Sequence, residues 1–270
     1  MANILIAAEE SVYTANEQKE GGWRGEREFI LVKREDESSV ITSFYFQPFD
    51  NQGLPDFDAG QFLTIVFDDI DGVAVRRNYS LSDAAGKDYL RISVKREPNG
   101  VVSNHLYNNI QLGDKVKLRA PSGDFTLRSN TKPLVLLTAG VGITPAISML
   151  NTAAGSGRDI RFIHAAINSD VHAFKQHVDT LAAGNNNIKP LYIYSQPQTH
   201  CQPHATGFID ASFIEAQLPA DRDVELYVLS PIGFMKSALT IATSLGIPNN
   251  QIHYEFFGPA ESLMPIRINK

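Results

Sequence analysis

The chain has 270 residues, of which 43% are hydrophobic, and a net charge of −6. This length suits two domains, and the acidic balance gives no support to nucleic-acid or membrane-surface binding, which needs a basic excess. No apolar run approaches the ~20 residues of a membrane span, and "MANILIAAEE" lacks the basic start of a signal peptide. The single cysteine, Cys201, excludes an internal disulfide and fits a cytoplasmic protein.

Residues 1–22 predict a terminal amphipathic helix followed by a linker. The segment turns polar after residue 8 and ends in Gly21-Gly22. An apolar stripe on such a helix needs a partner, so we expect it to be disordered, repacked or buried in an oligomer contact. The stripe has helical spacing and consists of Ile4, Leu5, Ala8, Val12 and Ala15.

Residues 23–130 predict an antiparallel barrel domain. Six short runs alternate apolar and polar residues and are rich in Val, Ile, Phe and Tyr, as half-buried strands are. One helix is expected at 103–110, and the crossover to the next domain is expected near 127–133. The six runs are "REFILVKRE", "VITSFYFQPF", "QFLTIVFDD", "VAVRRNYSLS", "YLRISVKRE" and "DKVKLRAPSG".

Two stretches of this domain contain candidate nucleotide-binding residues. In "RRNYSLS", Arg77 and Tyr79 share one face of a strand and Ser80 lies on the other. A guanidinium beside an aromatic ring suits a flavin nucleotide, although an ordinary exposed strand has the same pattern. In "EPNGVVSNHLYNNI", Gly100 permits close backbone approach and Ser103 predicts a helix cap, which favours either a pyrophosphate site or a plain turn.

Residues 131–270 predict a doubly wound parallel sheet. Nearly continuous apolar runs, such as "PLVLLT", "KPLYIY" and "VELYVLS", alternate with helical stretches. Examples are "VHAFKQHVDTLAA" at 171–183 and "GFMKSALTIATSLG". In "LVLLTAGVGITPAISML", a buried strand is expected to end at Thr138, a turn to follow at Gly140 and Gly142, and Pro145 to open a helix. Dinucleotides bind at this place in an open sheet, but the third glycine of GxGxxG is missing.

Three further features concern polar residues of this second half. Glu255 in "HYEFFGP" is a carboxyl in an apolar strand end, where its pKa could be raised; a solvated acid is the alternative. "HCQPH" offers His200, Cys201 and His204, but no second cluster completes a metal site, so no metal is predicted. His164, His172 and His177 are expected to be ordinary strand and helix residues, and no GxSxG elbow supports a hydrolase.

The order of these features resembles the ferredoxin–NADP reductase superfamily, and within it the reductase half of flavohaemoglobins. The resemblance covers nearly all of 23–259. The resemblance also implies that residues 1–22 correspond to the last globin helix and its junction with the reductase. The chain is expected to lack the globin domain and to hold no haem. The matching motifs are "RRNYSLS", "ISVKRE", "GVVSNHLYN", "RAPSGDF", "TAGVGITP", "HAAINSDVHAF", "SPIGFM" and "IHYEFFGP".

The resemblance implies FAD in a six-stranded antiparallel barrel and NAD(P)H on the doubly wound sheet. It places Ser80 near the hydride-accepting flavin nitrogen, and it gives Tyr79 and Glu255 catalytic roles. Phe62 stands where the family has a tyrosine, which removes one hydrogen bond. The residues implied for FAD are Phe62, Arg77, Asn78, Tyr79, Ser80, Lys95, Gly100, Val101, Val102, Ser103, Phe256, Phe257, Gly258 and Pro259.

Two places among the residues implied for the cofactors depart from the family pattern. Leu229-Ser230 stands where Cys-Gly is usual, and Phe256 replaces a cysteine; both changes put turnover in doubt more than FAD binding. Ser195-Gln196 lacks the arginine that would meet a 2′-phosphate, which favours NADH over NADPH. The residues implied for NAD(P)H are Ala139, Gly140, Val141, Gly142, Ile143, Thr144, Ser195, Leu229, Ser230 and Pro231.

The expected function is an NAD(P)H-dependent flavin oxidoreductase that passes electrons from NADH through FAD to a haem-type or other one-electron acceptor. This is the reductase role in a flavohaemoglobin-like nitric oxide dioxygenase. A globin or another carrier protein is expected to dock through residues 1–22. Two alternatives remain: a stand-alone reductase for a separate carrier protein, and a flavin-binding sensor or interaction module whose hydride transfer has decayed.

Overall fold

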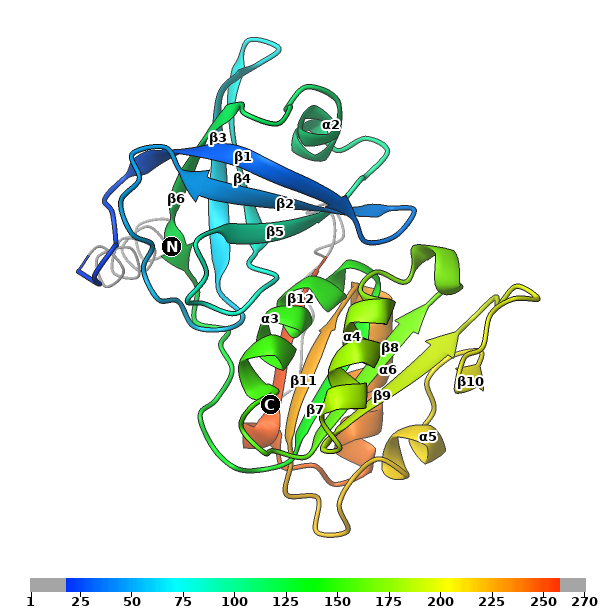
Figure 1. The fold of residues 1–270 in the computed structure, drawn as a ribbon. Coiled ribbons are helices and arrows are strands. Elements are labelled where there is room, and N and C mark those ends of the chain that lie inside the picture. The colour runs from blue at the N-terminus through cyan, green and yellow to red at the C-terminus, as the bar shows by residue number, and fades with distance from the viewer. Residues whose placement is uncertain (1–17, 258–270) are drawn as a thin grey trace, which may run out of the picture. The chain divides into compact units, whose positions relative to one another are not determined.

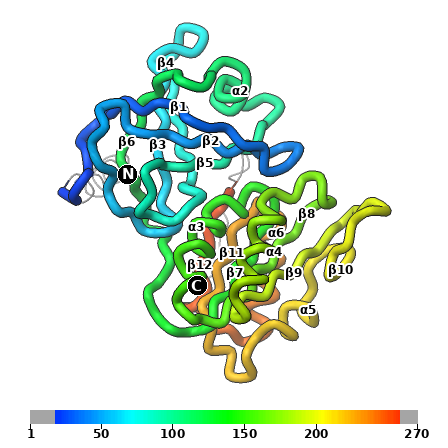
Figure 2. Tube along the Cα trace, in the orientation of Figure 1, coloured from blue at the N-terminus to red at the C-terminus, as the bar shows by residue number. Residues whose placement is uncertain are grey.

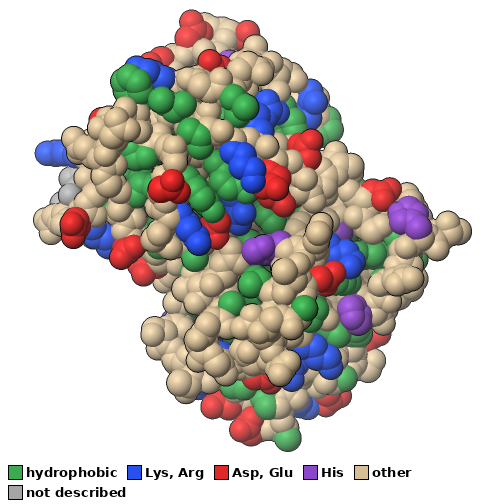
Figure 3. Space-filling model, viewed as in Figure 1, with side chains coloured by type: hydrophobic (Ala, Val, Ile, Leu, Met, Phe, Trp, Pro, Cys, Tyr) green, Lys and Arg blue, Asp and Glu red, His purple; other side chains and the backbone are tan. Residues whose placement is uncertain are grey.

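A computed structural model describes residues 18–257, which divide into two compact units (Figures 1 and 2). Among these residues the first unit contains 18–130, 144–157 and 173–175, and the second contains 131–143, 158–172 and 176–257. The stripe predicted on residues 1–15 lies outside the described residues. No helix within 18–257 combines the length and apolar character needed to cross a bilayer. On the face shown in Figure 3, acidic and basic side chains are intermixed.

The first unit contains a six-stranded antiparallel sheet in the order β4-β3-β6-β1-β2-β5. A bridge between Leu81 and Ile92 joins the β4 side to β5 and closes the sheet into the predicted barrel. The strands are β1 (Glu26–Asp36), β2 (Ile41–Pro48), β3 (Phe62–Ile70), β4 (Val73–Ser80), β5 (Leu90–Lys95) and β6 (Lys115–Ser122).

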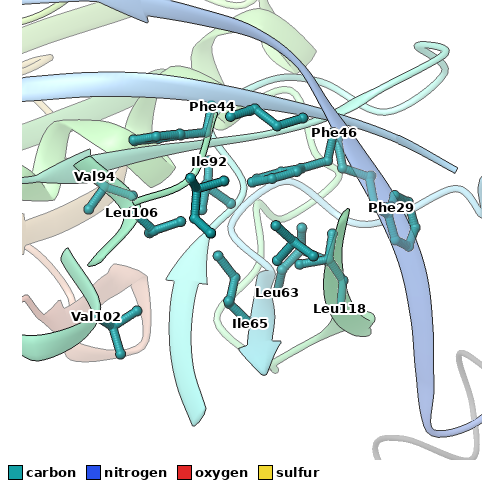
Figure 4. Packing of buried hydrophobic residues seen from close by; sticks show 14 of the residues in the cluster. Phe29, Phe44, Phe46, Leu63, Ile65, Ile92, Val94, Val102, Leu106 and Leu118 are labelled. Atoms are coloured by element: carbon teal, nitrogen blue, oxygen red, sulfur yellow. The ribbon is translucent and has the colours of Figure 1, made fainter. Parts of the chain in front are cut away.

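Alternation along these strands fills the barrel core. In β5, Leu90, Ile92 and Val94 point inward because successive side chains of a strand take opposite faces. Helix α2 (Val101–Asn108) covers one end with Val102 and Leu106, which are four residues apart on one helix face. Figure 4 shows these side chains packing together with those of Phe29, Phe44, Phe46, Leu63, Ile65 and Leu118.

The second unit contains a six-stranded parallel sheet in the order β10-β9-β8-β7-β11-β12. The central strands β7 and β11 are buried along their whole length, which explains their continuous apolar sequences. The two-residue strand β10 is not predicted from the sequence, because two residues show no period. The strands are β7 (Leu134–Ala139), β8 (Ile160–Ala166), β9 (Ile188–Tyr194), β10 (Ala205–Thr206), β11 (Glu225–Ser230) and β12 (Ile252–Phe256).

Helices cover both faces of this sheet, as a doubly wound fold requires. Leu191 and Ile193 of β9 pack in one cluster with α5 (Ala211–Glu215) and α6 (Ile232–Ser244). Tyr192, between them, points to the other face, where its hydroxyl donates to Asp179 of α4 (Lys175–Gly184) at 2.6 Å. The short helices η1 (Gly140–Gly142), η2 (Ser169–Val171) and η3 (Asn249–Gln251) lie in the connections.

The outer edge of β9 is only partly covered by β10, which pairs with Ile193 and Tyr194. Further along the edge, the backbone N–H of Tyr192 donates to the His204 ring at 3.0 Å, and the His204 N–H donates back to the Tyr192 carbonyl at 2.8 Å. Pro190, two residues earlier, has no N–H. The edge therefore exposes few hydrogen-bond donors.

Two helix starts differ from the sequence-based expectation. The helix predicted over 171–183 begins at Lys175, because η2 ends at Val171 and Phe174 has a φ of 61°. A buried non-glycine residue in this region costs of order 1–3 kcal/mol. Helix α3 (Ile143–Ala153) begins two residues before Pro145, so Pro145 lies within the first turn, where its missing N–H is still tolerated.

Candidate functional site

The β4 strand places Arg77 and Tyr79 on the core face of the barrel wall. They lie opposite Ile65 and Leu63 of β3, which are fully buried. Tyr79 packs against the core, and burial raises the pKa of its phenol to about 12, so the ring is neutral at physiological pH. The exposed guanidinium of Arg77 forms no hydrogen bond or ion pair with another described residue. It is available to an anion beside an aromatic surface.

The neighbouring Arg76 provides the exposed cross-strand arginine that the alternative interpretation of this strand expected. Its guanidinium pairs with Glu26 at 3.4 Å across the barrel wall. Asn78, on the same face as Arg76, accepts a hydrogen bond from the Thr64 hydroxyl at 2.8 Å. The two adjacent arginines therefore have different surroundings, and only Arg77 is left without a partner in the described part of the chain.

Ser80 and Phe62 lie opposite each other on the outer face, where β4 and β3 pair. The half-buried Phe62 ring rests against Gly123, where an added Cβ would lie 3.0 Å from a ring carbon. Gly123 has a φ of 115°, a conformation that other residues rarely adopt. Glycine is therefore required both for the turn after β6 and for the position of the Phe62 ring.

Helix α2 begins at Val101, two residues earlier than predicted, and Ser103 is not its cap. Gly100 is the N-cap residue and offers no side-chain hydrogen bond. The Ser103 hydroxyl lies inside the first turn, where it donates to the Gly100 carbonyl at 3.2 Å and accepts from the Glu97 N–H at 3.3 Å. The first turn holds no acidic residue, so its backbone N–H groups and the helix dipole favour an anion.

Lys95, which was implied for FAD, is engaged within the barrel. Its ammonium group pairs with Glu97 at 2.8 Å. The next residue, Arg96, donates to Asn104 and Asn108 and so ties α2 to the end of β5. Lys95 thus contacts the turn before α2 through Glu97, while Arg96 sets the orientation of the helix.

In the second unit, the glycine turn after β7 is a 3₁₀ turn. β7 ends at Ala139, one residue later than predicted, and Gly140 is exposed with a φ of 53°. Gly142 has no room for a side chain, because a Cβ would overlap the Leu229 carbonyl and lie 2.8 Å from the Ser230 nitrogen. The first turn of α3 holds no acidic residue. Backbone N–H groups and a helix N-terminus therefore meet here, as a dinucleotide phosphate requires.

Of the three residues proposed at the end of β11, only Pro231 exposes its side chain. Leu229 and Ser230 are fully buried, and the Ser230 carbonyl accepts from the Phe257 N–H at 3.1 Å. The Ser230 hydroxyl has no hydrogen-bond partner among the described residues. The Leu229 backbone lies against Gly142, and the buried Leu229 side chain does not line an open surface.

Glu255 lies on β12, opposite Leu229 of β11. Burial raises the pKa of its carboxyl to about 7, and it forms no ion pair or hydrogen bond with another described residue. Phe256 packs partly against the core of the second unit. Gly258 and Pro259 lie outside the described residues.

The loop after β9 holds Ser195 and Gln196, with the Gln196 side chain exposed. Their backbone N–H groups donate to the Ala166 and Ile167 carbonyls at 3.0 and 2.9 Å. Further along this loop, His200 faces Ser169 and Asp170, whereas His204 bonds to the β9 backbone. Within residues 18–257, no group of three His, Cys, Asp or Glu side chains is arranged to hold a metal ion.

The sequence-based interpretation did not find two buried polar pairs. His164 of β8 bonds to the Thr138 hydroxyl at 2.7 Å and stacks near His172; burial holds the pKa of His164 well below its usual range. Asp83 and Arg91 form a buried ion pair in the first unit. The sequence does not indicate these pairs, because no local pattern marks the residues as buried.

Comparison with known proteins identifies the family. Residues 28–127 match the model of the oxidoreductase FAD-binding domain, and residues 136–240 match that of the oxidoreductase NAD-binding domain. The flavohemoprotein of Pseudomonas putida is 48% identical over 264 residues, which cover 97% of this chain and 67% of that protein. The chain thus spans about two thirds of this relative's length.

Solved structures agree with this assignment. The flavohem-like FAD/NAD-binding domain of nitric oxide dioxygenase from Vibrio cholerae matches with a TM-score of 0.80 and 33% identity, over 87% of this chain and 100% of that one. Flavohemoglobin from Malassezia yamatoensis, with bound FAD and heme, matches with a TM-score of 0.81 and 25% identity, over 95% of this chain and 65% of that one. This chain therefore belongs to the flavohemoprotein family, corresponds to its FAD- and NAD-binding reductase part, and is an NAD(P)H-dependent flavin oxidoreductase.

Proposed function

We propose that the chain takes electrons from NADH and delivers them, through FAD, to a haem-type one-electron acceptor. The observation that carries this proposal is the Arg77–Tyr79 pair, a free guanidinium beside a neutral, half-buried phenol ring. The relatives are named flavohemoproteins, and the Vibrio cholerae protein is named a nitric oxide dioxygenase. Nitric oxide detoxification in a reducing compartment is therefore the process to which we assign this chain.

The described residues fit an FAD. Tyr79 offers an aromatic face for packing against the isoalloxazine ring, and Arg77 offers a bidentate donor for the pyrophosphate. The uncapped start of α2, which follows Gly100, adds backbone N–H groups that can bind a phosphate. Ser80 supplies a hydroxyl on the adjacent outer face of β4. Bound FAD supplies the ability to take a hydride from NADH and to release the electrons one at a time.

The nucleotide is assigned to the turn after β7. Gly140–Gly142 and the start of α3 bind its phosphates, and the exposed Pro231 lies at the neighbouring strand end. Ser195 and Gln196 carry no positive charge for a 2′-phosphate, and this supports NADH as the donor. Glu255 can hold or release a proton close to neutral pH, which suits a group that balances charge as the flavin is reduced.

The acceptor is assigned from the family. A globin haem receives the electrons in this proposal, and residues 1–22 provide the attachment to it. The test is to mix the reduced protein anaerobically with a ferric globin and follow the haem absorbance. Haem reduction supports the proposal, whereas reduction of an iron–sulfur carrier protein in preference to every globin tested supports the stand-alone reductase instead.

The donor half of the proposal is tested by mixing the FAD-loaded protein with NADH without oxygen. The oxidised-flavin absorbance is expected to bleach within seconds, and unchanged absorbance would refute hydride transfer and favour the sensor alternative. Arg77→Ala is expected to weaken FAD binding about 10- to 100-fold, since a charge-assisted hydrogen bond contributes roughly 1.5–3 kcal/mol. Arg76→Ala, which removes only an exposed ion pair, is the matched control and is expected to change FAD affinity less than threefold.

A further inference from the structure

Asp83 is a buried carboxylate in the loop between β4 and β5, three residues after Ser80. Only 8% of the residue is exposed. One carboxylate oxygen accepts from the Tyr89 hydroxyl at 2.8 Å. The other accepts from the Asn151 amide at 2.7 Å and from the Ala84 N–H at 2.9 Å. The carboxylate is therefore fully surrounded by donors.

Arg91 of β5 supplies the opposite charge. It is 7% exposed, and its guanidinium lies 3.6 Å from the Asp83 carboxylate. The guanidinium also donates to the Ser82 carbonyl and to the Tyr45 hydroxyl. Burial alone would raise the pKa of Asp83, but the Arg91 charge and the donated hydrogen bonds lower it below its ordinary value. Asp83 thus stays ionised across the range in which enzymes are assayed.

Helix α3 is attached to this carboxylate by two side chains on one of its faces. The Ser148 hydroxyl donates to the Asp83 carbonyl at 2.8 Å, and Asn151, three residues later, donates to the carboxylate. Residues 144–157 accordingly group with the barrel strands in the first unit. The same helix follows the Gly140–Gly142 turn without a break in the chain.

A second attachment converges on the same arginine. The ring of Phe174 lies 5.2 Å from the Arg91 guanidinium, and residues 173–175 also group with the first unit. Phe174 keeps a left-handed backbone conformation although it is 3% exposed and has a large side chain. Such backbone conformations persist where the surrounding structure fixes them, so the position of the Phe174 ring beside Arg91 is constrained.

A buried ion pair gives little net stability, because desolvation offsets the attraction between the charges. Its geometric effect is larger, since each buried charge must keep its partners. We propose that the Asp83–Arg91 pair is a positioning element that holds α3 on the barrel and thereby preorganises the glycine turn at the start of α3 for the NADH phosphates. This inference rests on the proposed function in one respect, the assignment of that turn to the nucleotide.

The test compares Asp83→Asn, Asn151→Ala and Ser148→Ala in the FAD-loaded full chain. Each is expected to raise the KM for NADH and the Kd for NAD⁺ at least fivefold, because the turn must then be ordered during binding. The limiting rate of flavin reduction at saturating NADH is expected to change less than twofold, and FAD affinity not to change.

Asp88→Asn is the matched control, since Asp88 lies in the same loop, is exposed and, within residues 18–257, accepts only from the Gln47 amide at 2.9 Å. It is expected to leave KM and Kd unchanged. Unchanged NAD⁺ affinity in Asn151→Ala, or parallel loss of FAD, would overturn the inference in favour of a purely structural ion pair. Asn151→Ala removes the hydrogen bond to the Asp83 carboxylate and decides the matter if Asp83→Asn does not fold. NAD⁺ binding is measured by calorimetry and needs no turnover. If NADH cannot reduce the wild-type protein, the proposed function is refuted, but the NAD⁺ affinities of the variants can still be compared.

Discussion

At the scale of single residues, burial does more than sequence position to set chemical behaviour. Glu255 and Glu215 are both glutamates of the second unit, but Glu215 is exposed and paired with Arg222 at 2.6 Å. Glu255 has no such partner among the described residues, and burial raises the pKa of its carboxyl to about 7. The proposed proton-holding role is therefore assigned to Glu255, because burial raises the pKa of its carboxyl and this pKa can be measured.

Replacing Glu255 by Gln is expected to remove one pH dependence of stability. The carboxyl pKa is higher in the folded protein than the ~4.3 of an unfolded chain, so its contribution to stability is complete below about pH 4 and is lost as the pH rises through 7. From pH 6 to 8, the Tm of the wild type is expected to fall relative to Glu255→Gln. Glu215→Gln serves as the control, and an equal pH dependence in wild type and Glu255→Gln would contradict the assignment.

The choice between NADH and NADPH is also expected to depend on single residues. Gln196→Arg is expected to lower the KM for NADPH about 10-fold, because a guanidinium can meet the 2′-phosphate with charge-assisted hydrogen bonds. Gln198→Arg adds the same charge two residues further along the loop and is expected to change the KM for NADPH less than threefold. Steady-state kinetics with both nucleotides measures this, and a wild type that already uses NADPH as efficiently as NADH would contradict it.

At the scale of elements, both proposed phosphate sites combine a glycine with a helix start that no side chain or acid occupies. Helix α2 follows Gly100 in the first unit, and α3 follows the 140–142 turn. In the turn before α3, glycine is required at two positions for two different reasons. Gly140 adopts a positive φ, and Gly142 lies too close to the β11 backbone for a side chain.

Gly142→Ala is expected to weaken NAD⁺ binding at least 10-fold, because its methyl group would displace the Leu229–Ser230 peptide and distort the turn. FAD content is expected to stay at the wild-type level. Gly155→Ala is the matched control, since a Cβ there meets nothing within 4 Å. Isothermal titration with NAD⁺ and flavin absorbance measure the two effects. Equal losses in both variants, or loss of FAD in Gly142→Ala, would show that general destabilisation is the cause.

Elements with a clear period could be predicted from the sequence, and those defined by tertiary contacts could not. The barrel strands and the buried strands β7 and β11 were identified correctly, since their burial patterns repeat along the chain. The start of α2 was placed two residues late, because the N-cap residue is Gly100 and not Ser103. The Asp83–Asn151 bond joins residues 68 positions apart, and no local pattern indicates it. The roles of individual site residues stay predictions.

At the scale of the whole molecule, the chain has two cores. The barrel core is built around residues such as Phe44 and Leu63, and the core of the sheet around residues such as Leu137 and Val228. Two separate family models match the chain, one over residues 28–127 and the other over residues 136–240. The division is not a simple cut in the sequence, since 144–157 and 173–175 group with the barrel.

Two ligands are therefore expected to stabilise two parts of the protein separately. In differential scanning calorimetry, FAD at about 100 times its Kd is expected to stabilise the barrel transition by roughly 2.7 kcal/mol, and NAD⁺ the transition of the sheet. At the same ligand concentrations, Arg77→Ala is expected to reduce only the first shift, and Gly142→Ala only the second. A single transition moved equally by both ligands in both variants would contradict independent sites.

The blocked outer edge of β9 has a consequence for how the protein behaves at high concentration. An open sheet edge is a template on which another chain can add a strand, and this is a common route to aggregation. Here Pro190 offers no donor, the Tyr192 N–H is taken by the His204 ring, and β10 covers the last two residues. His204→Ala is expected to free one donor at this edge, so that self-association becomes more frequent while electron transfer by the folded monomer is unaltered.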